Sequence, residues 1–200
     1  MTLIGHLNTL ESAGLVRIAQ LEPDLEYLFR HALVREAAYS SILSVDQKKL
    51  HRVVGEAIEQ LYPDRIDEYA AMLSYHFGEA GDKNRALKYC ALAGEAALAT
   101  YANREAESNF RCALGLVTRE PERANLLSQL GEALYRQSRY HETIQTWHDG
   151  IQIYRELGDY EGVARLYARS ARASWYAGDH PEGLRLCLEG LQEVEGMPEN

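Results

Sequence analysis

The feature that most constrains the fold is a short break that recurs between amphipathic segments. The chain reads AGDKNRAL at 80–87, LGDYEGVA at 157–164 and AGDHPEGL at 177–184, so that an Asp directly follows a Gly each time. Gly supplies the left-handed backbone conformation that ends a helix, and Asp caps the next one. Each break therefore ends one helix and begins another within a few residues, which makes successive helices antiparallel neighbours.

Between these breaks, the apolar residues of 64–196 recur every three or four positions, which is the period of a helix with one buried face. The pattern also repeats at longer range. A shift of 40 residues places Leu127 on Tyr167, Trp147 on Cys187 and Gly150 on Gly190. We therefore predict a mainly α fold in which similar helix pairs stack on one another.

Four segments carry a small residue four positions before a large one and another small residue three positions after it. These triplets are Ala86–Cys90–Ala93, Ala106–Phe110–Ala113, Thr143–Trp147–Gly150 and Gly183–Cys187–Gly190. All three members of a triplet share one helix face, so the large side chain fills the space that small residues of a facing helix leave open. We expect the four central residues to be buried. The phase of the pairing stays open, because segment 84–99 suits either the second helix of one pair or the first helix of the next.

Together with the run L-x-x-L-G-x-x-L-Y at 127–135, this pattern resembles the tetratricopeptide repeat (TPR) family. The resemblance covers about two-thirds of the chain, and the period here is longer than the family's roughly 34 residues. It implies a right-handed TPR-like superhelix of antiparallel helix pairs over residues 64–196.

Residues 1–62 follow another pattern. A short amphipathic helix ends at Gly14, and LVRIAQ and LEYLFR then alternate like two strands around LEPD, whose Pro and Asp suit a turn. We predict a hairpin at about 15–30 and helices at about 32–43 and 46–61. A helix, a hairpin and a trailing helix resemble the back half of a winged-helix domain. Residues 1–62 are thus expected to be a partial winged-helix domain in a fragment of a longer protein.

The run FRHALVREAAY at 29–39, followed by Leu50-His51, resembles the winged-helix segment of STAND-type signalling ATPases, which include bacterial transcription activators and cyclase-linked ATPases. The resemblance implies an upstream P-loop domain that binds nucleotide, and a repeat array that acts as sensor. It also implies that His31 contacts nucleotide phosphates, in the full-length parent only. Ala32 stands where the best-known members carry Asp. The alternative is that His31 is a packing residue that bonds a backbone carbonyl.

Composition excludes some classes of function. With 21 basic and 30 acidic residues the formal charge is −9, which argues against nucleic acid as the main partner. No stretch approaches the roughly 18 apolar residues of a membrane span, so we expect no membrane association. Cys90, Cys112 and Cys187 are widely spaced in apolar helical patterns, and we expect buried thiols in a reducing compartment instead of a disulfide framework or metal cluster. We therefore expect a cytoplasmic protein.

The sequence carries no pattern typical of catalysis. It has no G-x-x-x-x-G-K-[ST] and no G-x-G-x-x-G run to hold phosphates. HETIQ at 141–145 supplies one histidine where a zinc-protease helix needs two, and His141 and His148 have no third ligand placed beside them. We predict no catalytic residue, no metal site, no cofactor and no enzymatic activity, although a parent protein could be an ATPase or cyclase through other domains.

Binding is the remaining class of function. Stacked helix pairs present a concave face formed by the first helix of each pair. Tyrosines and arginines outside the packing stripes are the interface candidates, since both residue types often anchor interfaces. They are Arg136, Arg139, Tyr140, Arg169, Arg172 and Tyr176. Two hypotheses stay open. A regulatory module that binds a protein or peptide would have a continuous groove, whereas a receptor for a small effector would have an enclosed, partly apolar pocket.

Overall fold

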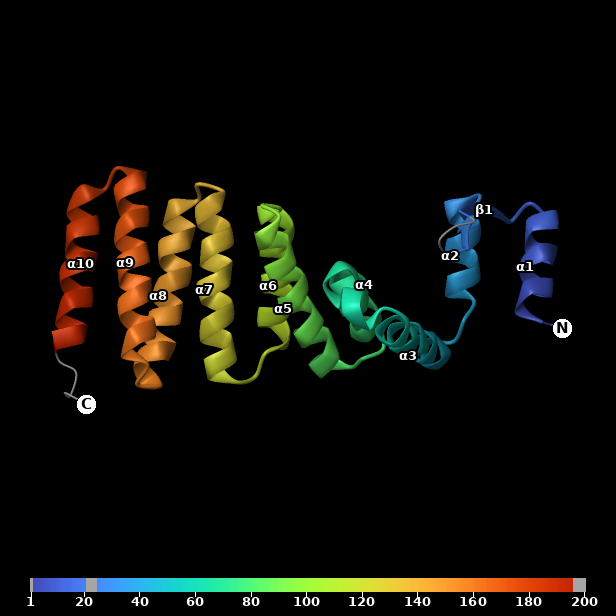
Figure 1. The fold of residues 1–200 in the computed structure, drawn as a ribbon, viewed down its shortest axis with the longest axis horizontal. Helices are drawn as coiled ribbons and strands as arrows, with labels where there is room; N and C mark the ends of the chain where they lie inside the picture. Colours follow the sequence, from blue (N-terminus) through green and yellow to red (C-terminus); the bar gives the residue numbers. More distant parts are fainter. Residues whose placement is uncertain (1, 21–24, 196–200) are drawn as a thin grey trace. The chain divides into compact units, whose positions relative to one another are not determined.

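The computed structural model describes residues 2–20 and 25–195, and Figure 1 shows it as a ribbon. The chain divides into two compact units, Met1–Leu50 and His51–Asn200. Each unit is described by itself.

The first unit contains a two-stranded antiparallel hairpin among its described residues. Val16 pairs with Phe29 and Arg17 with Leu28, and the register shifts between Ile18 and Gln20. Its LEPD turn lies outside the described residues. The elements are α1 (Leu3–Ser12), β1 (Val16–Gln20), β2 (Glu26–Phe29) and α2 (Ala32–Ser40), followed by α3 (Ser44–Leu61), which continues into the second unit. The winged-helix assignment of residues 1–62 stays a prediction.

The second unit is an array of helices that pack in chain order, as Figure 1 shows from α4 to α10. After the 3₁₀ turn η1 (Pro63–Arg65), the described residues form helices and no strand, as predicted. From α5 to α10, each helix packs against the one before it. The helices are α4 (Ile66–Glu79), α5 (Lys83–Ala99), α6 (Asn103–Leu116), α7 (Glu120–Arg136), α8 (Tyr140–Glu156), α9 (Tyr160–Ala177) and α10 (His180–Glu195).

The Gly–Asp breaks have the predicted geometry. Gly81, Gly158 and Gly178 adopt left-handed φ angles of 76°, 71° and 86°. Each following Asp accepts a hydrogen bond from a backbone N–H three residues later, at distances of 3.1, 2.8 and 3.1 Å for Asp82, Asp159 and Asp179. These turns hold neighbouring helices antiparallel, and the mainly α, TPR-like fold is confirmed.

Three close contacts place a glycine of one helix against an aromatic ring of the following helix, and they indicate which helices form pairs. A Cβ atom added to Gly131 of α7 would lie 2.1 Å from Nε1 of Trp147 in α8. The same addition would lie 2.5 Å from the Phe110 ring at Gly94, and 2.8 Å from the Phe77 ring at Gly55. The glycine is on the first helix and the ring on the second each time. The pairs are therefore α3 with α4, α5 with α6 and α7 with α8, and α9 with α10 completes the series.

Burial of the predicted core residues agrees with the sequence in three of four cases. Phe110 and Trp147 are fully buried, and Cys90 is 1% exposed. The expectation for Cys187 is wrong, because this residue is exposed on α10. The inward position there belongs to Leu186, which is 5% exposed. Among the described residues, no later helix covers the side of α10 on which Cys187 lies.

The prediction of free thiols is also wrong for two of the three cysteines. Cys90 of α5 and Cys112 of α6 form a disulfide, with their Cα atoms 6.1 Å apart. The two cysteines are 22 positions apart in the sequence, but the antiparallel packing of α5 on α6 brings them within the range that a disulfide spans. The predicted reducing compartment rested on free thiols and loses that support.

We expect Trp147→Ala to lower the free energy of unfolding by about 3–5 kcal/mol, because a large side chain is removed from a closed site. The indole N–H also donates to the Ser128 carbonyl at 3.0 Å. Chemical denaturation measures the change. The matched control is Trp175→Ala, whose side chain is 60% exposed, and a similar loss for both variants would contradict the assigned packing.

Candidate interaction surface on the first helices

A groove runs between α5 and α7, which are the first helices of adjacent pairs. Its volume is about 550 Å³. Apolar side chains contributed by α5, α6 and α7 line it together with polar ones. The apolar residues are Leu87, Ala91, Leu116 and Leu126, and the polar residues include Lys83, Asn84, Lys88, Glu95, Asn125 and Gln129.

The polar groups of the groove are only partly paired within the chain. Gln129 donates its amide to Glu95 at 3.0 Å, while its own carbonyl oxygen has no hydrogen-bond partner. The Lys88 ammonium lies 4.8 Å from the centre of the Tyr89 ring. Neither Lys83 nor Lys88 forms an ion pair with a described residue. The groove thus offers two cationic donors to a bound molecule.

The predicted interface residues Arg169, Arg172 and Tyr176 follow i, i+3, i+7 spacing and form a ridge on α9, which carries a second set of unpaired cations. The Arg169 guanidinium lies 6.0 Å from the Trp147 ring centre, and that of Arg172 lies 5.3 Å from Tyr135. Neither arginine forms an ion pair with a described residue, whereas Arg165 on the same helix lies 3.6 Å from Glu161. Contact with an aromatic face orients a guanidinium without neutralising its charge, so both arginines keep their charge available.

Three tyrosines gather beside this ridge. The Tyr140 and Tyr176 rings stack with centres 6.1 Å apart, and Tyr135 lies 5.7 Å from Tyr140 and 6.1 Å from Tyr176. Burial raises the pKa of Tyr135 above its ordinary value. Tyr176 remains 61% exposed. Of the six predicted interface residues, the structure therefore brings Tyr140, Arg172 and Tyr176 together.

Two other predicted interface residues are engaged in contacts within the chain. Arg136 donates to Glu132 at 2.8 Å and to the Leu98 carbonyl of α5 at 2.8 Å. Arg139 lies 2.6 Å from Glu107 of α6 and 2.5 Å from Glu142 of α8. These arginines connect neighbouring helices, so they are less available to a partner than Arg169 and Arg172.

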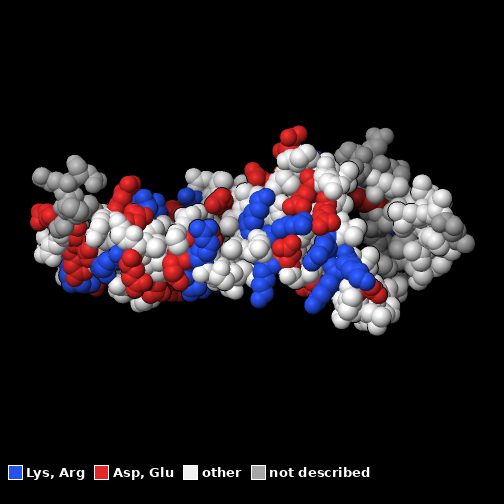
Figure 2. Space-filling view, turned by 90° about the horizontal axis from the view of Figure 1, so that it is seen from below, with Lys and Arg blue, Asp and Glu red and all other residues white. Residues whose placement is uncertain are grey.

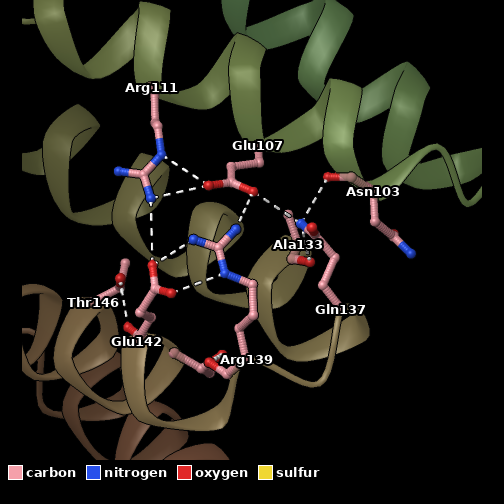
Figure 3. A network of polar contacts seen from close by, with 9 residues as sticks. Asn103, Glu107, Arg111, Ala133, Gln137, Arg139, Glu142 and Thr146 are labelled. Carbon is pink, nitrogen blue, oxygen red and sulfur yellow. Dashed lines mark hydrogen bonds and ion pairs between the residues drawn. The ribbon is translucent and has the colours of Figure 1, made fainter.

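Figure 3 shows the network around Glu107, which links α6 to the turn between α7 and α8. Glu107 accepts hydrogen bonds from Gln137 at 3.1 Å and from Arg111 at 3.0 Å, in addition to the Arg139 contact. Burial alone would raise the pKa of this carboxyl. The hydrogen bonds from Gln137 and Arg111 and the charge of Arg139 outweigh that effect and hold its pKa below the ordinary value.

His31 lies directly after β2, where it is the N-cap residue of α2. Its side chain is exposed and makes no capping hydrogen bond. No described residue supplies the carbonyl contact that the alternative role of a packing histidine requires. The phosphate-sensing role stays a prediction.

The wider surface has a mixed character. Figure 2 shows basic and acidic side chains interspersed over the face turned to the viewer. Within the described part of the chain, no group of three or more His, Cys, Asp or Glu side chains could hold a metal ion. None of the helices formed by the described residues is long and apolar enough to cross a membrane.

Sequence reasoning missed the groove residues and Tyr135. Lys88, Asn125 and Gln129 face the groove only because α5 and α7 are both first helices, and the sequence left that phase open. These residues could have been identified from the sequence by matching Gly94 and Gly131 to the aromatic residue of the following helix, because that match shows which helix is the first of each pair.

Comparisons with known proteins concern the fold. No protein-family model and no curated protein matches the chain. Similar solved structures include MamA MSR-1, at 18% identity and a TM-score of 0.46, over 81% of this chain and 98% of that one. MamA 41-end from Desulfovibrio magneticus RS-1 is 12% identical with a TM-score of 0.45, over 78% and 100%. TPR-like repeats of a Podosopora anserina kinesin light chain protein are 14% identical with a TM-score of 0.44, over 75% and 93%. The helix pairing described above rests on the contacts within the chain itself.

We expect Glu107→Gln to lower the free energy of unfolding near pH 7 by about 1–3 kcal/mol, because charged hydrogen bonds are lost. A carboxyl whose pKa is lowered by folding stabilises the fold above its unfolded pKa, and this contribution disappears as pH falls through the folded pKa. The difference between wild type and variant should therefore shrink below about pH 4.5. Denaturant titrations at several pH values measure it.

The matched control for this network is Glu161→Gln, since the Glu161 side chain is 91% exposed beside Arg165. That variant should change stability little at any pH. A pH-independent loss in Glu107→Gln would contradict the electrostatic role of Glu107.

Proposed function

We propose that the chain is a regulatory protein-interaction module that holds an extended segment of a partner protein on its first helices. The observation that carries the proposal is the set of unpaired cations along these helices. Lys83 and Lys88 border the α5–α7 groove, and Arg169 and Arg172 lie on α9 against aromatic rings. In a chain with a formal charge of −9, where many arginines pair with Glu, these four side chains are open to an incoming carboxylate.

The repeat relates the groove to the ridge. A shift of 40 residues carries Gln129, which lines the groove on α7, to Arg169 on α9, and carries Glu132 to Arg172. Corresponding positions of the first helices face the same way in a repeat array. A segment seated in the groove would continue over α9, where Tyr176 offers an exposed aromatic contact.

The alternative is a small effector bound in the groove alone. A volume of about 550 Å³ with an apolar lining and a few polar groups suits a small molecule as well as part of a peptide. The two proposals differ at α9, because a small molecule in the groove would not need Arg172.

We further propose that the module belongs to a STAND-type signalling ATPase, in which residues 1–62 are the winged-helix part and His31 reads the nucleotide phosphates. The resemblance of residues 29–39 supports this proposal, as does an exposed imidazole at the junction of β2 and α2. Imidazole can donate a hydrogen bond to phosphate, which would couple the wing to the nucleotide state.

We predict that peptides selected from a displayed random library will bind the chain through both regions. Lys88→Glu and Arg172→Glu should each lower the affinity for a selected peptide by about tenfold or more, because each reverses the charge of a side chain that contacts the peptide. Fluorescence anisotropy with the labelled peptide measures the affinity. The matched control is Arg104→Glu on α6, an exposed arginine on a second helix. An equal loss in the control would contradict the proposed face, and a loss confined to Lys88→Glu would favour the small effector.

We predict that calorimetric titration of this chain with ADP will show no binding, because no glycine-rich loop or P-loop lysine is present in it. The reading frame before residue 1 tests the wider proposal, which requires a P-loop domain there. In that longer protein, His31→Ala should speed nucleotide exchange at unchanged thermal stability. Unchanged exchange would leave His31 without a sensing role.

A further inference from the structure

Two histidines meet where α3 packs on α4. The Nδ1 atoms of His51 and His76 lie 2.9 Å apart, which is hydrogen-bond distance. His51 is 8% exposed and His76 is half-buried. The Tyr75 ring lies edge-on to the His51 ring, with the two centres 5.4 Å apart. The pair is therefore held inside the contact between the two helices, where water has little access.

The hydrogen bond within the pair requires one imidazole to donate and the other to accept. At least one of the two rings must then be neutral. When both rings are protonated, both Nδ1 atoms carry hydrogen, so the hydrogen bond is lost and two positive charges face each other in a poorly solvated place. The packed helices therefore accommodate at most one imidazolium ion at this position.

The ionisable groups along the two helices do not offset a second positive charge. Burial and the charge of His51 both lower the pKa of His76 below its ordinary value. The other ionisable side chains within four positions of either histidine are Lys48, Lys49, Arg52, Tyr75 and Glu79. Three of these are cationic and one is anionic, so their charges together oppose a further proton.

Two side chains of α5 also reach α3. Arg85 lies 3.2 Å from Glu56 and 3.2 Å from Glu59, and Tyr89 donates its hydroxyl to Glu59. Both carboxylates lie more than one turn beyond His51 on α3. They are engaged with α5, so they do not neutralise the histidine pair.

The histidines lie beside the contact that joins the two helices. Gly55 follows His51 by one turn of α3, and a Cβ atom on that glycine would lie 2.8 Å from the ring of Phe77, which follows His76 directly. Repulsion between two imidazolium rings would act on this contact at once. α3 begins in the first unit and ends in the second, whereas α4 belongs to the second unit alone.

We propose that His51 and His76 form a pH-sensitive switch, which releases residues 51–61 of α3 from α4 when both rings are protonated. Above about pH 6.5, the ordinary pKa of histidine, the two rings share at most one proton and the helices stay packed. As the pH falls below that value, the released state binds more protons than the packed state, so the packing loses stability. The helices from α5 to α10 keep their packing on one another. The proposal does not depend on peptide binding by the first helices.

Hydrogen–deuterium exchange followed by mass spectrometry tests the switch on the whole chain. After correction for the intrinsic pH dependence of exchange, the protection of residues 51–61 should fall by about tenfold between about pH 7.5 and about pH 5.5, because the lower value is about one unit below the ordinary pKa. Protection of α8 should change little.

The double variant His51→Gln/His76→Gln cannot bind these protons, so residues 51–61 should keep their protection at the lower pH. The matched control is His141→Gln, which replaces an exposed histidine of α8 and should respond like wild type. Protection of residues 51–61 that does not depend on pH in wild type, or that falls equally in the double variant, would overturn the proposal.

Nuclear magnetic resonance keeps the proposal testable if the double variant fails to fold. In wild type, the assigned imidazole signals of His51 and His76 should show that the pair takes up its second proton well below about pH 6.5. Uptake of both protons near the ordinary pKa would show that the packed helices tolerate two imidazolium ions, and it would overturn the switch.

Discussion

The array depends on a large side chain of one helix packing into the space above a small residue of its partner. Trp147 against Gly131, Phe110 against Gly94 and Phe77 against Gly55 repeat this contact in three successive pairs. Close-packed interiors leave little room for adjustment, so each such contact determines both the separation of its two helices and their relative position along the axis. The Gly–Asp turns make neighbours antiparallel, and a glycine that meets a ring of the following helix marks a pair. Between α8 and α9 the order is reversed, since Gly162 of the later helix meets the Tyr154 ring of the earlier one.

This pairing also decides what remains at the surface. Because the glycine side of each first helix is filled by the second helix, its other side is free to form a shared face with the first helices before and after it. Lys88, Gln129 and Arg169 lie on that face for this reason. Second helices pack on both sides, against their partner and against the next first helix. This is why Leu184, Leu188 and Leu191 of α10 are apolar although no described residue covers them.

The sequence was sufficient to predict features that depend on residues close together in the chain. The helical character of residues 64–196, the Gly–Asp turns and the burial of Phe110 and Trp147 all follow from local pattern, and the structure agrees with them. The local pattern did not show which helix begins each pair. The triplet Ala86–Cys90–Ala93 in a first helix has the same spacing as Ala106–Phe110–Ala113 in a second helix. Cys187 was misjudged although its spacing is the same, because Leu186 takes the buried position on α10 and Cys187 is exposed.

The interface arginines show most clearly where local pattern ends. Arg139 and Arg172 were both interface candidates from the sequence, since each lies near a tyrosine and outside the packing stripes. Arg139 meets Glu107, which is 32 positions away and reaches it only through the packing of α6 on α7. Arg172 meets the Tyr135 ring, and no carboxylate of the described residues pairs with it. A charge that is neutralised within the fold connects helices, and a charge held on an aromatic face stays available to a partner. The difference between a structural arginine and a binding arginine is therefore decided by the neighbouring helix.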